Sequence, residues 1–261
     1  MPIFAPLNPP LPPWNAARVW IIGASTGIGA AAAAQLLRAG ARVALSARST
    51  DKLHGIAGMD PNAIVAPLDF TEPGAVAHTR DMLLGTWGAL DLVLVVAGTH
   101  HEMRAWELND ADARALFEVN VHAVMRAVAD VVPTLIAQGH GAVGIVASVA
   151  GYSGLPKALI YGASKAAMIN FTETLYLDLH PKGLGVYLIN PGFVDTPLTA
   201  ENDFQMPHLI SADEAARLLI AGLRAGAFEI HFPHAFTRQL KLLRLLPYRL
   251  YFAIVRRSTG L

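Results

Sequence analysis

Short apolar runs alternate with segments of helical periodicity from Arg18 to about Phe232. The run Leu90–Val96 is almost wholly apolar, as is typical of a strand buried on both faces of a parallel sheet. We predict strands at Arg18–Ile22, Ala41–Ser46, Ala63–Leu68, Leu90–Val96, Ala142–Ala147, near Val186–Ile189 and near Phe228–Phe232. We predict helices from the turn after the first strand to about Ala39, and at about Asp110–Ala137, Tyr161–His180 and Ala212–Ala225. Repeated strand–helix–strand units predict a single α/β domain, a doubly wound parallel sheet with helices on both faces.

The two ends of the chain depart from this pattern. We divide the chain into a proline-rich arm (residues 1–17), the sheet domain (18–232) and a basic amphipathic helical extension (233–261). The N-terminal stretch is broken by prolines and lacks an early Lys or Arg, which predicts an extended arm and no secretory signal peptide.

The extension carries six basic residues and no acidic one between Phe236 and Arg257. At about 100° per residue, three basic residues share one side of a helix and three leucines lie largely opposite: Arg238, Lys241 and Arg244, and Leu240, Leu243 and Leu246. Pro247 predicts a break before a second apolar turn. Such helices can lie in a membrane interface, so residues 236–257 are candidates for peripheral membrane contact. The alternative is that this apolar face packs on the protein's own surface or on another subunit.

Composition narrows the function classes. The 261 residues are 53% hydrophobic and 15% charged, as in a globular protein, and 20 basic residues balance 20 acidic ones. This balance argues against a nucleic-acid binder, which would carry a basic excess. The absence of cysteine excludes disulfides and thiol chemistry and fits a cytoplasmic protein. We see no apolar run long enough to cross a bilayer.

Three glycines lie between the first strand and the first helix, in the sequence Gly23-Ala-Ser-Thr-Gly27-Ile-Gly29. Gly23 permits the tight turn, Gly27 lets the backbone approach a phosphate, and Gly29 lets the helix pack closely on the strand. The helix N-terminus offers N–H groups and a positive dipole end to a pyrophosphate. The turn therefore predicts a dinucleotide site, whose other members are Ser25, Thr26 and Ile28.

The end of the second strand distinguishes the two nicotinamide dinucleotides. An acidic residue there would bind the ribose hydroxyls of NAD and repel the extra phosphate of NADP. This strand ends Ser46-Ala47-Arg48-Ser49, without a carboxylate. Arg48 can bind a 2′-phosphate, with Ser25 and Ser49 as further donors, although an ordinary surface arginine also fits this position. We predict NADP(H) in preference to NAD(H).

Tyr161-Gly-Ala-Ser-Lys165 places a phenol and an ammonium four residues apart, on one face of a predicted helix. A tyrosine titrates near ~10 and is a poor acid–base catalyst at neutral pH. The ammonium, together with the positive nicotinamide of an oxidised cofactor, would favour the phenolate and lower the tyrosine pKa.

Three further motifs occur along the chain in the order in which the classical short-chain dehydrogenase/reductase family has them. With these motifs the chain resembles that family, which has a Rossmann-like fold. These motifs are Ala147-Ser148-Val149-Ala150-Gly151, Phe117-Glu-Val-Asn120-Val and Pro191-Gly-Phe-Val-Asp-Thr196. The resemblance covers about Arg18–Thr196 and implies an oxidoreductase that moves a hydride between nicotinamide and a carbonyl or alcohol. The chain departs from the family pattern in two places, at Ile22 and at Val95-Val96-Ala97-Gly98. In the family, polar groups at these places brace the strands beneath the cofactor, and in this chain they are replaced.

The resemblance also implies roles for the site residues. Tyr161 would exchange a proton with the substrate oxygen, Ser148 would hydrogen-bond that oxygen, and Lys165 would lower the tyrosine pKa and hold the nicotinamide ribose. Asn120 would bend its helix locally and hold a water that links Lys165 to solvent.

Further cofactor contacts are implied at three other places in the chain. Asp69 would contact the adenine, and Thr196 and the backbone near Val194 would contact the carboxamide; an N-cap aspartate and a turn threonine are the structural alternatives. The implied cofactor set also includes Ala97, Gly98, Pro191 and Gly192, besides Tyr161 and Lys165. The resemblance implies a homodimer or homotetramer.

The substrate should lie over the nicotinamide, between the residues after Ser148 and the segment Leu198–Ile210. That segment contains Phe204, Met206, Pro207 and Leu209, which predicts either a lid for an apolar substrate or a simple cover of the core. His100 and His101 follow the fourth strand and could edge the site, although they also fit surface positions. Because a third ligand is missing near them, we predict no metal.

We predict an NADP(H)-dependent oxidoreductase that acts on a small apolar carbonyl or alcohol. Two rival functions on the same fold stay open. One is a regulator that binds NADPH without turnover, and the other is a membrane-peripheral interaction protein.

Overall fold

The computed structural model describes residues 5–200 and 206–260. Within these residues, seven parallel strands form one sheet in the order β3-β2-β1-β4-β5-β6-β9. The strands are β1 (Arg18–Ile22), β2 (Arg42–Ser46), β3 (Ala63–Val65), β4 (Leu92–Val95), β5 (Ala142–Val146), β6 (Gly185–Pro191) and β9 (Glu229–Phe232). The order of strands reverses between β1 and β4, and ligands of such sheets bind at the carboxyl ends beside this reversal.

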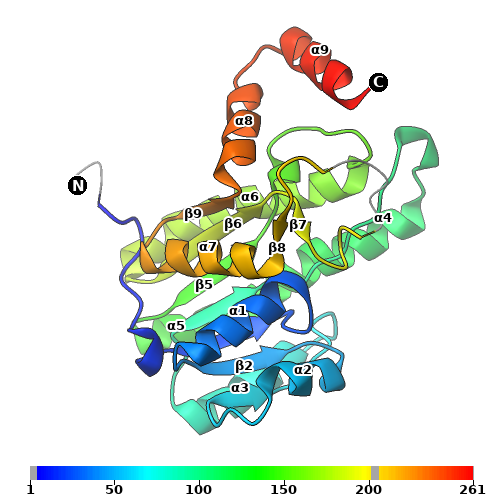
Figure 1. Ribbon diagram of the computed structural model, residues 1–261. Helices are drawn as coiled ribbons and strands as arrows, with labels where there is room; N and C mark the ends of the chain where they lie inside the picture. Colours follow the sequence, from blue (N-terminus) through cyan, green and yellow to red (C-terminus); the bar gives the residue numbers. More distant parts are fainter. Residues whose placement is uncertain (1–4, 201–205, 261) are drawn as a thin grey trace.

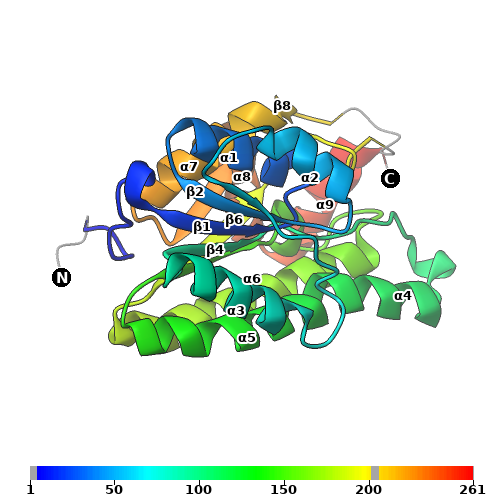
Figure 2. The ribbon, with the colours of Figure 1, turned by 90° about the horizontal axis from the view of Figure 1, so that it is seen from below.

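Helices cover both faces of the sheet, so the fold is the expected Rossmann-like α/β domain (Figure 2). On one face lie α1 (Gly27–Arg38), α2 (Thr50–Ala57) and α7 (Ala212–Arg224). On the other lie α3 (Ala75–Trp87), α4 (Asp110–Phe117), α5 (Ala123–Gln138) and α6 (Leu159–Leu179). Each face has its own apolar core, because alternate residues of the buried strands point to opposite sides. Trp20 belongs to one core and its neighbour Ile21 to the other.

Most strands lie close to their predicted positions, and β1 has the predicted residues. The third strand ends at Val65, three residues before the predicted Leu68, although backbone hydrogen bonds from Ala66 to Leu45 and from Leu68 to Ala47 continue along the same edge. Helices α2 and α3 were not predicted, and each carries a glycine that weakens the helical signal, Gly55 and Gly85. The division at residues 17 and 232 stays a prediction.

A five-residue π-helical segment, η3 (Glu118–His122), joins α4 to α5. The combined stretch Asp110–Gln138 is long and apolar enough to cross a membrane by length and composition alone. The expectation that no apolar run reaches this length is therefore wrong. However, 44% of its most apolar window is buried inside the structure, where Val124, Val128 and Leu135 belong to a sheet core. Packing on the sheet accounts for its apolar character.

Two helices follow the last strand and stand outside the layered body (Figure 1). They are α8 (His234–Arg244) and α9 (Tyr248–Thr259), and the chain breaks between them at Pro247, as predicted. We call residues 234–259 the C-terminal arm. At the other end of the chain, the side chain of Asn8 is buried, and its amide donates to the carbonyl of Val186 at 2.8 Å.

A second, two-stranded parallel sheet pairs β7 (Val194–Asp195) with β8 (Ile210–Ser211). It joins the two ends of the predicted lid segment, of which residues 201–205, including Phe204, lie outside the described residues.

Candidate functional site

The turn between β1 and α1 has no room for side chains at its three glycines. Gly23 has a φ of 100°, and a Cβ at this position would overlap the backbone nitrogen of Ala97. A Cβ on Gly29 would overlap the carbonyl oxygen of Gly23. Gly27 has a φ of 55°, and its Cβ would lie 2.9 Å from the Thr196 Cγ2 atom. The turn therefore keeps bare backbone next to α1, as the phosphate-binding prediction requires.

The N-terminus of α1 is open for an anion. Thr26 is its N-cap residue, and no side chain among the described residues caps the helix there. The first N–H groups of a helix have no partner within the helix, and they favour negative charge. This cradle fits a dinucleotide pyrophosphate.

At the end of β2, Arg48 is exposed and Ser49 is the N-cap residue of α2. Ser46 points into the core, where its hydroxyl accepts a hydrogen bond from the Trp20 indole at 2.9 Å. The Thr71 side chain and backbone both donate to the Asp69 carboxylate, at 2.6 and 3.0 Å. These hydrogen bonds, and then the charge of Arg48, hold the pKa of Asp69 below its usual range. Arg48 and Asp69 therefore lie near each other at the edge predicted for the adenosine end of the cofactor.

Gly98, just after β4, lies where two candidate catalytic side chains meet. A Cβ at this position would lie 3.2 Å from the Asn120 Oδ1 atom and 3.4 Å from the Lys165 Nζ atom. The preceding residues Val96 and Ala97 both donate backbone hydrogen bonds to the carbonyl of Ile22, at 2.8 and 3.0 Å. These backbone hydrogen bonds hold the ends of β1 and β4 together. They do so in the segment where this chain lacks the polar side chains of the family pattern.

Asn120 lies fully buried in the π-helical segment, which is the local distortion that we predicted at this residue. Its amide oxygen accepts from the backbone N–H of Thr99 at 2.8 Å, and its amide nitrogen donates to the carbonyl of Thr99 at 2.9 Å. The same nitrogen approaches the Ser164 hydroxyl at 3.2 Å. Asn120 therefore joins the loop after β4 to α6.

Helix α6 carries Tyr161 and Lys165 on one face, as their spacing predicts. The Lys165 ammonium is buried, donates to the carbonyl of Val146 at 3.0 Å and lies 5.8 Å from the centre of the Tyr161 ring. Ser148, at the start of a short 3₁₀ turn (η4, Val149–Gly151), accepts from the backbone of Ala150 at 3.1 Å. Its side chain also hydrogen-bonds to the Tyr161 phenol.

Burial shifts the pKa values of these two groups. Burial raises the pKa of Tyr161, and the hydrogen bond with Ser148 opposes that rise only in part. Burial also lowers the pKa of Lys165 from 10.5 to about 8. For these protein groups by themselves, desolvation of the phenolate outweighs the neighbouring polar groups. The predicted lowering includes the charge of an oxidised nicotinamide, so it stays a prediction.

The segment after β6 returns to the glycine turn. Pro191 is buried, Gly192 donates to the carbonyl of Phe232 at 2.7 Å, and the Thr196 side chain packs beside Gly27. The Thr199 hydroxyl donates to the carbonyl of Val194 at 2.6 Å, which folds this segment into a turn. Val194 and Thr196 thus lie on the same side of the sheet as the phosphate cradle.

The structure adds neighbours that the sequence did not clearly indicate. The ring of His100 meets the Tyr161 ring edge-on, with 4.6 Å between centroids, so this histidine borders the site, whereas His101 is exposed. The ion pair between Lys157 and Glu102, at 2.9 Å, joins the loop after β4 to the loop after β5. The position of His100 after a central strand was its only sequence signal. Among the described residues, no group of three metal-ligating side chains occurs.

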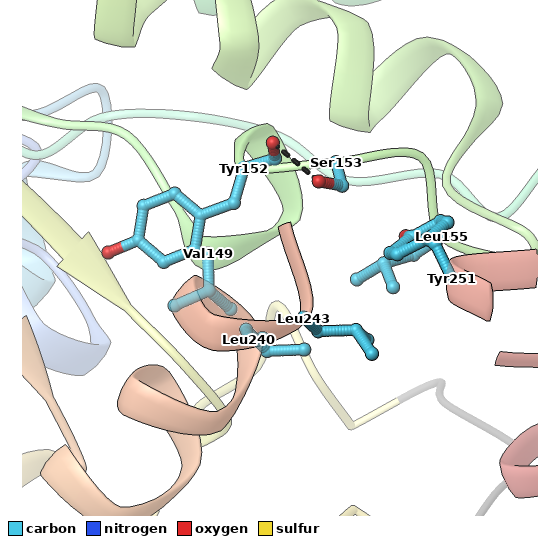
Figure 3. Close-up of a pocket in the computed structure, with 7 residues that line it drawn as sticks. All are labelled: Val149, Tyr152, Ser153, Leu155, Leu240, Leu243 and Tyr251. Carbon is cyan, nitrogen blue, oxygen red and sulfur yellow. Dashed lines mark hydrogen bonds between the residues drawn. The ribbon is translucent and has the colours of Figure 1, made fainter. Parts of the chain in front are cut away.

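The C-terminal arm forms part of the wall next to Ser148. Leu240 and Leu243 of α8 face Val149 and Leu155 across a cavity of about 10 Å³, about the minimum for one ordered water (Figure 3). The Tyr251 hydroxyl of α9 donates to the carbonyl of Gly154 at 2.5 Å. This apolar face of α8 therefore packs on the protein's own surface, which was the alternative to membrane contact for these leucines.

A bare glycine cradle, a buried Tyr–Lys–Ser group and a parallel sheet define a nicotinamide-dependent oxidoreductase as the class of protein. A family model described as short chain dehydrogenase matches residues 17–206, so the chain belongs to the short-chain dehydrogenase/reductase family and is an NAD(P)-dependent oxidoreductase.

Individual relatives agree with this assignment. An uncharacterized oxidoreductase of Myxococcus xanthus is 33% identical over 241 residues, 91% of this chain and 95% of that protein. A short-chain dehydrogenase/reductase of Burkholderia phymatum, solved in complex with NAD, superposes with a TM-score of 0.78 at 25% identity and covers 87% of this chain and 92% of its own. ElxO with NADP bound superposes with a TM-score of 0.73 at 19% identity, covers 84% of this chain and 99% of its own, and supports the fold alone.

Proposed function

We propose that the protein is an NADP(H)-dependent reductase or dehydrogenase of small apolar carbonyls and alcohols, with Tyr161 as the acid–base residue. The observation that carries this proposal is the group formed by Tyr161, Lys165 and Ser148. A phenol, an ammonium and a hydroxyl lie together there, beside the glycine turn that fits a dinucleotide.

The chemistry follows from what each group can donate. The nicotinamide, when bound, supplies or accepts the hydride. Tyr161 has a raised pKa, so it keeps its proton at neutral pH and can donate it to the carbonyl oxygen of the substrate. The Ser148 hydroxyl holds the same oxygen in place, and Lys165 holds the nicotinamide ribose. Asn120 keeps the loop after β4 and α6 in register around Lys165.

Arg48 supports the preference for NADP(H). Its guanidinium is exposed at the end of β2 and close enough to Asp69 to lower the pKa of that carboxyl. An arginine binds phosphate through charge-assisted hydrogen bonds, worth about 1.5–3 kcal/mol. We therefore expect Arg48→Ala to raise the KM for NADPH about 10- to 100-fold and to change the KM for NADH less than threefold. Initial-rate kinetics with both cofactors checks this, and equal losses for the two cofactors would contradict it.

An apolar substrate is supported by the side chains around the site. Val149, the residue after Ser148, is buried, and buried Met103 lies in the loop after β4. We further propose a cytoplasmic homodimer or homotetramer. Family membership supports the oligomer, and light scattering on the purified protein tests it.

Oxidation of NADPH and NADH against a panel of ketones and aldehydes, with Tyr161→Phe beside the wild type, tests the function. Loss of a general acid costs about 10²- to 10⁴-fold, so kcat should fall by that factor while NADPH binding is retained. Turnover that survives in Tyr161→Phe would overturn the role of this residue. NADPH binding without turnover of any substrate in the wild type would favour the regulator instead.

A further inference from the structure

One face of the C-terminal arm contacts the body. Besides the leucines over Val149 and Leu155, the Lys241 ammonium pairs with the Glu229 carboxylate at 2.5 Å, and Tyr251 is buried against the loop at Gly154. These contacts fix which side of α8 and α9 points away from the protein.

The outer face carries an unusual number of exposed apolar side chains. Six of the sixteen large apolar residues that are exposed in the described part of the chain lie within residues 242–254. They are Leu242, Leu245, Tyr248, Leu250, Phe252 and Ile254. Leu245 and Tyr248 are each 78% exposed, and the rings of Tyr248 and Phe252 stack with 5.6 Å between centroids. Clusters of exposed apolar residues mark interaction surfaces, whereas isolated ones need no explanation.

The arm also carries a strong excess of basic residues. Five arginines of the arm are exposed, and the described residues provide none of them with an ion pair to a carboxylate: Arg238, Arg244, Arg249, Arg256 and Arg257. No Asp or Glu follows Glu229 in the sequence. The positive charge of the arm therefore favours an anionic partner. The exposed apolar side chains favour a partner with an accessible hydrocarbon region.

An anionic lipid bilayer has both properties. Leucines and aromatic rings enter the boundary between headgroups and acyl chains, while arginines bind the phosphates. A second copy of this chain is a poorer partner, because a symmetric arm-to-arm contact would oppose arginines with arginines. We propose that residues 238–257 dock the protein on the surface of an anionic membrane.

Co-sedimentation of the full-length protein with lipid vesicles tests this proposal. The protein should sediment with vesicles that contain phosphatidylglycerol, not with pure phosphatidylcholine, and high salt should weaken the binding. Arg249→Glu/Arg256→Glu should bind at least about 25-fold more weakly, because each basic residue near such a surface contributes about a factor of five. Tyr248→Ser/Phe252→Ser should also reduce binding, since it removes apolar contact without changing charge.

The matched control is Arg38→Glu/Arg42→Glu, which reverses two exposed arginines near the amino ends of the strands. It should bind vesicles like the wild type, and circular dichroism should show that all three variants are folded. The proposal is overturned if the wild type does not sediment with anionic vesicles, or if Arg249→Glu/Arg256→Glu binds as the control does. It is also overturned if that variant changes the oligomeric mass, because the arm would then be a subunit interface.

Discussion

Lys165 is a buried ammonium that has one acceptor among the described residues, the carbonyl of Val146. Its pKa falls from 10.5 to about 8 because burial disfavours the charged form. At pH 7 that fall corresponds to about 3 kcal/mol of lost stability, since one pKa unit is about 1.4 kcal/mol. Because the buried ammonium lowers the stability of the folded protein, stability does not explain its presence. Lys165 is therefore the clearest single-residue sign of function at this site.

We therefore expect Lys165→Met to unfold at a higher temperature than the wild type at pH 7 while losing oxidoreductase activity. The lost hydrogen bond to Val146 offsets part of the gain, which leaves about 1–2 kcal/mol. The wild-type penalty is complete below pH 8 and disappears towards pH 10.5, so the difference should shrink as the pH rises through that window. Thermal unfolding from pH 7 to 10 checks this, and a variant less stable at pH 7 would contradict it.

Tyr161 shows the opposite effect of the same burial, because burial raises its pKa and keeps the phenol protonated. This protonation state suits the acid role in carbonyl reduction that we propose for Tyr161. The edge-on ring of His100 covers part of the same phenol ring.

At the scale of elements, the glycine turn is the most constrained part of the molecule. Its three glycines meet Ala97, Thr196 and the turn's own backbone, so the ends of β1, β4 and β7 all meet at one loop. The shape of the phosphate cradle therefore depends on three strands at once.

Gly29→Ala should distort this turn, because its new Cβ would overlap the carbonyl oxygen of Gly23. We expect a loss of about 1–3 kcal/mol in unfolding free energy and at least a tenfold weaker NADPH affinity. Gly85→Ala is the matched control, because this glycine lies in α3 with open space around it, and alanine there should stabilise by about 0.5–1 kcal/mol. Denaturant unfolding and fluorescence titration with NADPH measure both effects. Unchanged NADPH affinity in Gly29→Ala would exclude the turn from the cofactor site.

At the scale of the whole molecule, Glu229 connects three parts of the structure. These are the sheet, the segment after Ser148 that carries Tyr152, and the C-terminal arm. Its carboxylate accepts from the Tyr152 hydroxyl at 2.5 Å and the Asn190 amide at 2.8 Å, and it pairs with Lys241. Burial opposes ionisation of Glu229, but these three donors hold its pKa below the usual value. Burial, and then the neighbouring carboxylate, raise the pKa of Tyr152.

Glu229→Gln should loosen the arm, because it removes the charge that holds Lys241 and leaves a half-buried ammonium without its carboxylate. We expect about 2 kcal/mol of destabilisation, or roughly 4–8 °C in melting temperature, and faster tryptic cleavage within α8. The control is Glu214→Gln, which breaks an exposed pair with Arg217 and should leave the melting temperature nearly unchanged. Equal effects of the two substitutions would show that Glu229 does not anchor the arm.

Local spacing determined much of this protein. Strand β1, the glycine turn, the Tyr161–Lys165 pair and the break at Pro247 all lie as predicted, because each depends on neighbours within a few residues. The helices α2 and α3 escaped prediction because their glycines and polar residues blur the helical period, and packing on the sheet compensates for that.

Tertiary structure decided what depends on residues far apart in the sequence. It raised the pKa of Tyr161 in the protein alone, an effect that the local sequence does not show, because burial depends on the whole surrounding fold. It joined the side chain of Asn120 to Thr99 and Ser164, and it turned Leu240 and Leu243 inward while Leu242 and Leu245 stayed exposed. Helical periodicity shows that the arm has two faces, but contacts with residues far away in the sequence, such as Glu229 on β9 and Gly154, determine which face meets the body.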